Sequence, residues 1–223
     1  MLIREWMTTN VATVTVDISM LKASKLMKER NIRRLPVVDA RNHVIGIVSD
    51  RDIKAASPSK ATTLDAHELY YLLSELKIKD IMTPAPVTVR DSDTVETAAL
   101  LLEENTFGGL PVVNERDELV GIITDHDIFK VLVEISGARS GGLQLALRLP
   151  DEPGALCPIF DTLFKHKANI FTILTSRGDS ADGMSNVYIR LHPMPREEEK
   201  ALIEAVRGEL PLEYWVDDRL HEL

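Results

Sequence analysis

The chain has 223 residues, of which 44% are hydrophobic, so it can form one large domain or two to three small ones, each with a core. Its 35 acidic and 26 basic side chains give a net charge of -9, which repels phosphate backbones and anionic lipid and so disfavours nucleic acid as a general partner. A single cysteine, an N-terminus without an apolar signal core and the lack of an apolar run of about 20 residues predict a cytoplasmic protein that does not enter a membrane.

A tandem duplication dominates the first part of the chain. The segment LPVVDARNHVIGIVSDRDI at 35–53 returns as LPVVNERDELVGIITDHDI at 110–128, and Met7 corresponds to Met82 by the same offset. Two copies are too few for a solenoid. We therefore expect them to bury their apolar faces against each other in one domain.

Each copy predicts the order β-α-β-β-α. The first copy, 1–56, has elements at these residues: a short strand at 13–16, a helix at 19–30, strands at 35–38 and 44–48, and a helix at 50–56. Ser49, followed three residues later by Asp52, is a capping-type helix start. Thr124 and Asp127 repeat this arrangement in the second copy, 77–136.

Between and after the copies the composition changes. Turn-forming residues and a helical apolar stripe at 64–76 make 57–76 a linker with a helix, and the glycine-rich 137–142 is expected to be a flexible linker. The remainder, 143–223, reads β-α-β-β-α-β, with strands at 143–149, 170–176, 185–192 and 212–217 and helices at 155–167 and 196–208. This order is the ferredoxin-like plan, and the fold class of the whole chain is α+β.

Both copies end in a motif whose chemistry suits a nucleotide. A serine or threonine at a helix start can donate to a phosphate oxygen, an aspartate one turn later can accept from ribose hydroxyls, and a glycine lets a ligand approach the backbone. A structural explanation exists for each, because Ser-x-x-Asp is a common helix start and a strand glycine often accommodates packing. The residues are Gly46, Ser49 and Asp52 in the first copy and Gly121, Thr124 and Asp127 in the second.

Together these features resemble a pair of CBS domains, the Bateman module, over about residues 1–136. The resemblance rests on the repeated Met-Thr openings, the Leu-Pro-Val-Val strands and the motifs that end each copy. It implies clefts that bind adenosine compounds such as AMP, ADP, ATP or S-adenosylmethionine. It further implies that the motif serine or threonine lies at phosphate or ribose, that the aspartate lies at the ribose diol, and that Thr13 and Thr88 lie near the base.

The two copies differ in charge. Arg33 and Arg34 precede the buried strand at 35–38, where the CBS pattern often places bases that face phosphate, and Arg51 lies within the first motif. Guanidinium groups suit phosphate. The second copy has Gly108, Gly109 and His126 at the corresponding places. We therefore expect the cleft with the arginines to gain more from each added phosphate than the other.

The segment 149–156, followed by Asn169 and Ile170 on a βαββαβ plan, resembles an ACT domain over about 143–218. Such domains usually pair side by side and bind amino acids or other small effectors at the loop between the first strand and the first helix. A tight helix start explains the Pro-Gly pair of this loop equally well. The effector-binding residues that the resemblance implies are Asp151, Glu152, Gly154, Ala155 and Asn169.

A CBS pair followed by an ACT domain resembles AcuB-type acetoin-utilisation proteins, which implies a regulatory role in acetoin and acetate metabolism. The sequence has no metal-spaced His/Cys cluster, nucleophile elbow or P-loop, so we expect no catalytic residue, catalytic cofactor or metal. The prediction is a non-catalytic sensor of adenine nucleotides that forms a homodimer or a higher oligomer. The alternative is a ligand-free dimerisation scaffold or a regulatory subunit of a separate enzyme or transporter.

Overall fold

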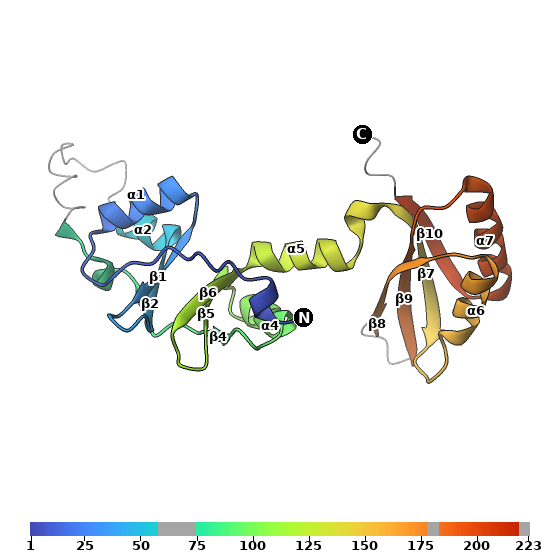
Figure 1. Cartoon of the computed structure of the whole chain (residues 1–223), viewed down its shortest axis with the longest axis horizontal. Helices are drawn as coiled ribbons and strands as arrows, with labels where there is room; N and C mark the ends of the chain where they lie inside the picture. Colours follow the sequence, from blue (N-terminus) through green and yellow to red (C-terminus); the bar gives the residue numbers. More distant parts are fainter. Residues whose placement is uncertain (58–74, 178–182, 219–223) are drawn as a thin grey trace. The chain divides into compact units, whose positions relative to one another are not determined.

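The structure, a computed structural model, describes residues 1–57, 75–177 and 183–218. They belong to two compact units, Met1–Phe129 and Lys130–Leu223, and the division falls within one helix, α5 (Asp125–Ile135). Figure 1 shows the elements of each unit. The helix predicted at 64–76 lies outside the described residues except for its last two positions.

The first unit contains both copies of the repeat. The first copy consists of α1 (Met20–Arg30), β1 (Arg34–Val38), β2 (Val44–Ser49) and α2 (Asp50–Ala56). The second copy consists of β3 (Thr83–Pro84), β4 (Val89–Arg90), α4 (Val95–Glu104), β5 (Gly109–Val113), β6 (Leu119–Thr124) and α5. The helices and strands predicted between 19 and 56 are confirmed to within one residue, whereas the strand predicted at 13–16 is a single parallel bridge between Val14 and Val37.

Each copy completes the sheet of the other. In the second copy, β3 pairs with β2 of the first copy, with Thr83 opposite Ile47. In the first copy, Thr8 forms a bridge with Ile122 of β6, and each backbone N–H of this pair donates to the other carbonyl at 3.0 Å. The core follows the same exchange, because Ile78 of the second copy is fully buried in the core of the first. The two copies therefore share one folded unit.

The second unit is a four-stranded antiparallel sheet with two helices. Its elements are β7 (Gly142–Pro150), α6 (Cys157–Lys165), β8 (Ile170–Ser176), β9 (Met184–Leu191), α7 (Arg196–Glu209) and β10 (Leu212–Asp218). The sheet order is β10-β7-β9-β8, and α6 and α7 cover one face (Figure 1). Leucines at every second position of β7, from Leu143 to Leu149, point into this core. The predicted βαββαβ order is confirmed, with each boundary within two residues.

The segment 137–142 leads directly into the first strand of the second unit. Residues Ala138–Ser140 form a short 3-10 helix, and Gly142 begins β7 opposite Asp218. The composition predicted a flexible linker, but close packing against a side chain and against backbone explains the glycines. A Cβ at Gly137 would collide with the Phe171 ring, and one at Gly141 would lie 2.7 Å from the Asp218 carbonyl oxygen.

Among the described helices, none is long and apolar enough to cross a membrane.

Candidate functional site

The first motif forms a reciprocal cap at the start of α2. The Asp52 carboxylate oxygen Oδ2 accepts from the Ser49 backbone N–H and from the Ser49 hydroxyl, both at 2.7 Å. In return the Asp52 backbone N–H donates to Ser49 Oγ at 3.3 Å. All hydrogen bonds of the Asp52 carboxylate within the described residues go to Oδ2. Its second oxygen therefore has lone pairs for a ligand hydroxyl.

The second motif repeats this geometry at the start of α5. The Asp127 oxygen Oδ2 accepts from the Thr124 hydroxyl at 2.7 Å and from the Thr124 backbone N–H at 3.0 Å. The two aspartates differ in exposure, because Asp127 is only 4% exposed whereas Asp52 is half-buried. In both motifs the hydroxyl hydrogen is directed at the aspartate. A phosphate that took this hydrogen would compete with the carboxylate.

Arg34 brings the two copies together. Its side chain extends from the start of β1 over Gly109, where a Cβ would lie 3.4 Å from Arg34 Cδ, and its guanidinium lies against Gly108. Burial lowers the pKa of Arg34, and the nearby Asp125 carboxylate partly opposes this change. An arginine stays protonated in proteins despite such a shift. The sequence assigned Arg34 and Gly108 to different clefts, but the structure makes them direct neighbours.

The motif glycines have a structural explanation in the exchange between copies. The Met82 sulfur fills the space beside Gly46, where an added Cβ would also lie 3.3 Å from the Thr83 carbonyl oxygen. The Met7 side chain packs on Gly121 in the same way. The close approach expected for a ligand at these glycines is therefore made by a methionine of the other copy.

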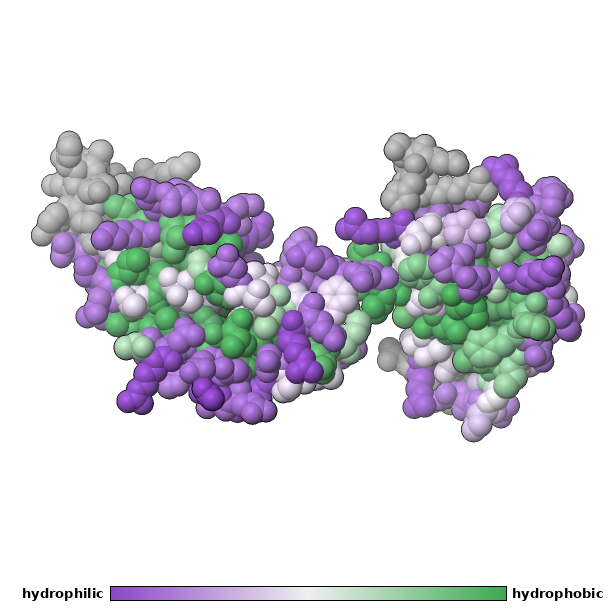
Figure 2. All heavy atoms as spheres, in the orientation of Figure 1, coloured by the Kyte–Doolittle hydropathy of each residue, from purple (hydrophilic) through white to green (hydrophobic). Residues whose placement is uncertain are grey.

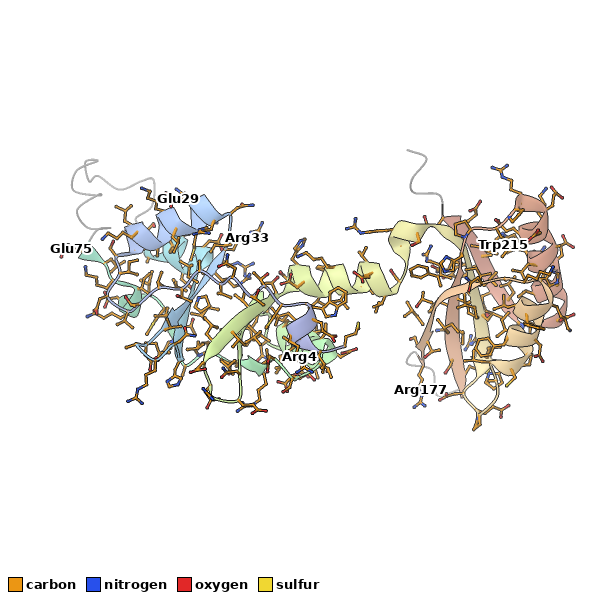
Figure 3. The ribbon with its side chains drawn as sticks, viewed as in Figure 1. Arg4, Glu29, Arg33, Glu75, Arg177 and Trp215 are labelled. Carbon is orange, nitrogen blue, oxygen red and sulfur yellow. The ribbon has the colours of Figure 1, made fainter. Side chains whose placement is uncertain are left out.

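The remaining predicted nucleotide residues lie at the surface or near it. Arg33, one residue before β1 (Figure 3), and Arg51 are exposed. Thr13 is half-buried beside the Val14 bridge, whereas Thr88 is exposed before β4. His126 is exposed, and its backbone N–H donates to Asp125 Oδ1 at 2.8 Å.

A cavity of about 580 Å³ lies at one end of the strands in the second unit. Its lining includes four of the five predicted effector residues, namely Asp151, Glu152, Gly154 and Ala155. Arg177, which follows β8 (Figure 3), also lines it and forms an ion pair with Asp151 at 2.8 Å. Arg177 was not among the residues predicted from the sequence. Since β7 and β8 are both antiparallel to β9, the residues that follow each strand lie at the same end of the sheet. The predicted topology would therefore have placed Arg177 near the β7–α6 loop.

Asn169 lies at the opposite end of the strands from this cavity. It precedes β8, and its carbonyl oxygen accepts from the His192 backbone N–H at 2.9 Å. The loop residue Asp151 instead donates to the Gly183 carbonyl oxygen, at the other end of β9. The two ends are separated by the length of β9, which rises about 3.3 Å per residue. Asn169 is therefore not part of the cavity.

Among the described residues, no group of three or more His, Cys, Asp or Glu side chains could hold a metal ion.

Comparison with known proteins gives the family and three similar structures. CBSX2 from Arabidopsis thaliana, in complex with AMP, is 35% identical, with a TM-score of 0.50, and the match covers 60% of this chain and 98% of that one. The CBS domain pair of protein MJ0100, in complex with 5'-methylthioadenosine and S-adenosyl-L-methionine, is 26% identical, with a TM-score of 0.50, and the match covers 59% and 95%.

A third structure is a protein from Vibrio cholerae described as an acetoin utilization protein, AcuB. It is 29% identical, with a TM-score of 0.52, and the match covers 62% of this chain and 95% of that one. The family model of the CBS domain matches residues 3–59 and 78–134, which correspond to the two copies and make up just over half of the chain. The chain therefore belongs to the CBS-domain family, with a tandem pair of these domains in its first part.

Proposed function

We propose that the chain is a non-catalytic regulatory protein that senses adenine nucleotides at its CBS pair. The observation that carries the proposal is the Arg34 guanidinium, which makes no hydrogen bond or ion pair within the described residues, lies against Gly108 and is near the Asp125 carboxylate of the second motif. A phosphate would supply the hydrogen-bonded anionic partner that this group lacks. The AMP in CBSX2 and the adenosyl compounds in MJ0100 support an adenine ligand.

The proposed roles follow from the motif geometry. Asp52 offers Oδ1 to ribose hydroxyls, while Oδ2 keeps the hydrogen bonds that cap α2. We assign Asp127 to the ribose in the second copy, Thr13 and Thr88 to the base, and Arg33 and Arg51 to positive charge near the phosphate, with His126 at the position that corresponds to Arg51. The ligand is AMP, ADP, ATP or S-adenosylmethionine, and no catalytic cofactor is involved.

For the second unit we propose an ACT-type effector domain. The cavity at the β7–α6 loop has one carboxylate and one guanidinium within an ion pair, Asp151 and Arg177. An amino acid has both complementary charges, an ammonium and a carboxylate, and would exchange this pair for two new ones. The similarity to AcuB supports a role in acetoin or acetate metabolism. A homodimer is the expected assembly, and the alternative is a ligand-free scaffold or a regulatory subunit.

Thermal unfolding with single ligands tests these proposals. A ligand bound only by the folded state adds about 2.7 kcal/mol at a hundredfold excess over Kd, so AMP, ADP, ATP or S-adenosylmethionine should raise the melting temperature by several degrees. Asp52→Ala and Asp127→Ala should each remove one site at a cost of about 1 kcal/mol for the lost cap. Exposed Asp17→Ala is the matched control.

Three outcomes would count against these proposals. A double aspartate variant that binds as well as the wild type would contradict the ribose role. No shift with any adenine compound would favour the scaffold, and product formed from ATP in a turnover assay would favour an enzyme. An amino acid that stabilises the wild type but also Arg177→Ala would contradict the effector site.

A further inference from the structure

The repeat is broken where its two copies meet. Positions 33 and 34 of the first copy correspond to 108 and 109 of the second, so two arginines stand opposite two glycines. The backbone keeps the symmetry at both places. Asp50 N–H donates to the Arg33 carbonyl oxygen at 2.9 Å, and Asp125 N–H approaches the Gly108 carbonyl oxygen at 3.4 Å. The difference is therefore one of side chains only.

The two glycines make room for Arg34. A Cβ at Gly108 would lie 2.5 Å from the Arg34 guanidinium carbon and even closer to Nη2, so every other residue would displace the group. A Cβ at Gly109 would lie 3.1 Å from Thr124 Cγ2 as well as 3.4 Å from Arg34 Cδ. We call Gly108 and Gly109 the arginine seat. The seat holds the Arg34 side chain beside the second motif although Arg34 belongs to the first copy.

The charges around the seat come from both copies. Arg34 interacts electrostatically with Asp125 of the second motif and with Asp50, Arg51 and Arg33 of the first. Asp50 is already engaged by Lys54, whose ammonium lies 2.8 Å from Asp50 Oδ2. Three guanidinium groups thus face two carboxylates, one of which has another partner. An anion at this place would relieve the excess of positive charge.

The geometry points to Gly108 as the residue that determines phosphate selectivity at the second motif, because it seats the guanidinium of Arg34 at the place where the second copy itself has glycines instead of arginines. Arg34 then supplies a phosphate-reading charge to the second motif, near Asp125, although it belongs to the first copy. The assignment rests on the proposed nucleotide-sensing function. It moves the phosphate preference from the first motif, where the sequence placed it, to the second.

Isothermal titration calorimetry with adenosine and ADP tests this role. In the wild type, ADP should bind more tightly than adenosine. Gly108→Ala displaces the guanidinium without removing it, so ADP affinity should fall about tenfold or more, as expected for a lost charge-assisted contact, while adenosine affinity changes little. Arg34→Ala should have the same effect, and the double variant should lose no more than either single one. Lys25→Ala, which removes an exposed charge on α1, is the control.

Two backgrounds identify the motif concerned. In Asp52→Ala, which leaves the second motif intact, Gly108→Ala should still abolish the preference for ADP. In Asp127→Ala, Gly108→Ala should change the ADP affinity of the remaining site much less. The opposite pattern would overturn the assignment. Urea unfolding of the same variants tests the seat itself, because Gly108→Ala should destabilise the wild type more than it destabilises Arg34→Ala, and equal losses would overturn the seat.

The outcomes separate this assignment from the proposed function. Binding of neither adenosine nor ADP to the wild type would overturn both. Binding of adenosine and ADP with equal affinity, or an ADP preference that survives in Gly108→Ala, would overturn the role of Gly108 alone.

Discussion

At the residue scale, the two hairpins of the repeat use the same turn with different side chains. Asp39 Oδ1 accepts from the backbone N–H groups of Arg41 and His43, both at 2.8 Å. In the second copy the amide oxygen of Asn114 accepts from the equivalent N–H groups at 2.9 and 3.0 Å. The backbone contacts are matched, but the second side-chain atoms differ, because Asn114 Nδ2 donates to Glu118 Oε2 at 2.8 Å whereas Asp39 Oδ2 lies 3.3 Å from His43 Nδ1. The hydrogen bond from the His43 backbone, with that from Arg41 and the nearby imidazole, holds the pKa of Asp39 below its ordinary value.

This difference predicts a pH dependence that belongs to the first hairpin. A carboxyl group whose pKa is lowered by folding stabilises the fold above its ordinary pKa and loses this contribution as pH falls through the lowered value. Asp39→Asn keeps both accepting bonds and should remove that part of the pH dependence. The measurement is urea unfolding of both proteins from neutral pH into the acid range.

The reciprocal variant is the control. Asn114→Asp combined with Glu118→His, which gives the second hairpin both side chains of the first, should introduce the loss of stability at acid pH that Asp39→Asn removes. Asn114→Asp alone would place a carboxylate against Glu118 Oε2, to which the Asn114 amide donates at 2.8 Å. Parallel curves for the wild type and Asp39→Asn would show that the Asp39 carboxylate does not contribute.

At the element scale, contacts between the copies decide the role of the strand glycines. Met82, one residue before β3, packs on Gly46 of β2, and the pairing of β3 with β2 sets this approach. Gly46→Ala should cost roughly 1 to 3 kcal/mol of unfolding free energy, as overpacking of a core usually does. The cost should fall when Met82 is also replaced by alanine, which urea unfolding of the single and double variants would measure.

A helical glycine without neighbours provides the comparison. Gly208 of α7 has no atom within 4 Å of an added Cβ, so Gly208→Ala should leave stability unchanged or raise it by about 0.5 to 1 kcal/mol. If Gly46→Ala behaved like Gly208→Ala, the packing role of Gly46 would be refuted.

The sequence predicted the elements but not these contacts between them. Local signals were enough for the capped start of α2 at Ser49 and for the alternating leucines of β7, because caps and periodicity depend on neighbours in the chain. The Met82 contact to Gly46 and the Arg34 contact to Gly108 depend on how the copies meet. Neither spacing nor composition contains that geometry, and Gly46 was therefore interpreted as space for a ligand.

At the scale of the whole molecule, the second unit presents apolar side chains to the surface. Phe164 of α6 is 85% exposed, and Tyr214 and Val216 of β10 are each 47% exposed. Figure 2 shows apolar atoms at the surface over the region of α6. In addition, β10 is an edge strand of its sheet, and an open edge with apolar side chains favours pairing with another chain.

We therefore expect self-association through the second unit. Light scattering should give a mass at least twice 24.9 kDa. Phe164→Glu or Val216→Lys should lower this mass if the altered face is the contact, because a buried unpaired charge is costly. A wild-type mass of a single chain at micromolar concentrations would reject the dimer.

The opening residues of each copy complete the sheet of the other copy. This arrangement also governs how the chain can fold while it is being made. Synthesis proceeds from the N-terminus and domains tend to fold as they emerge. Here the first copy lacks its third strand, Thr83–Pro84, and the buried Ile78 until the whole linker and the start of the second copy have left the ribosome. The residues around Thr8, made first, must wait for β6. The nascent first copy is thus an incomplete sheet with an open edge, and its folding is committed only when the second copy arrives.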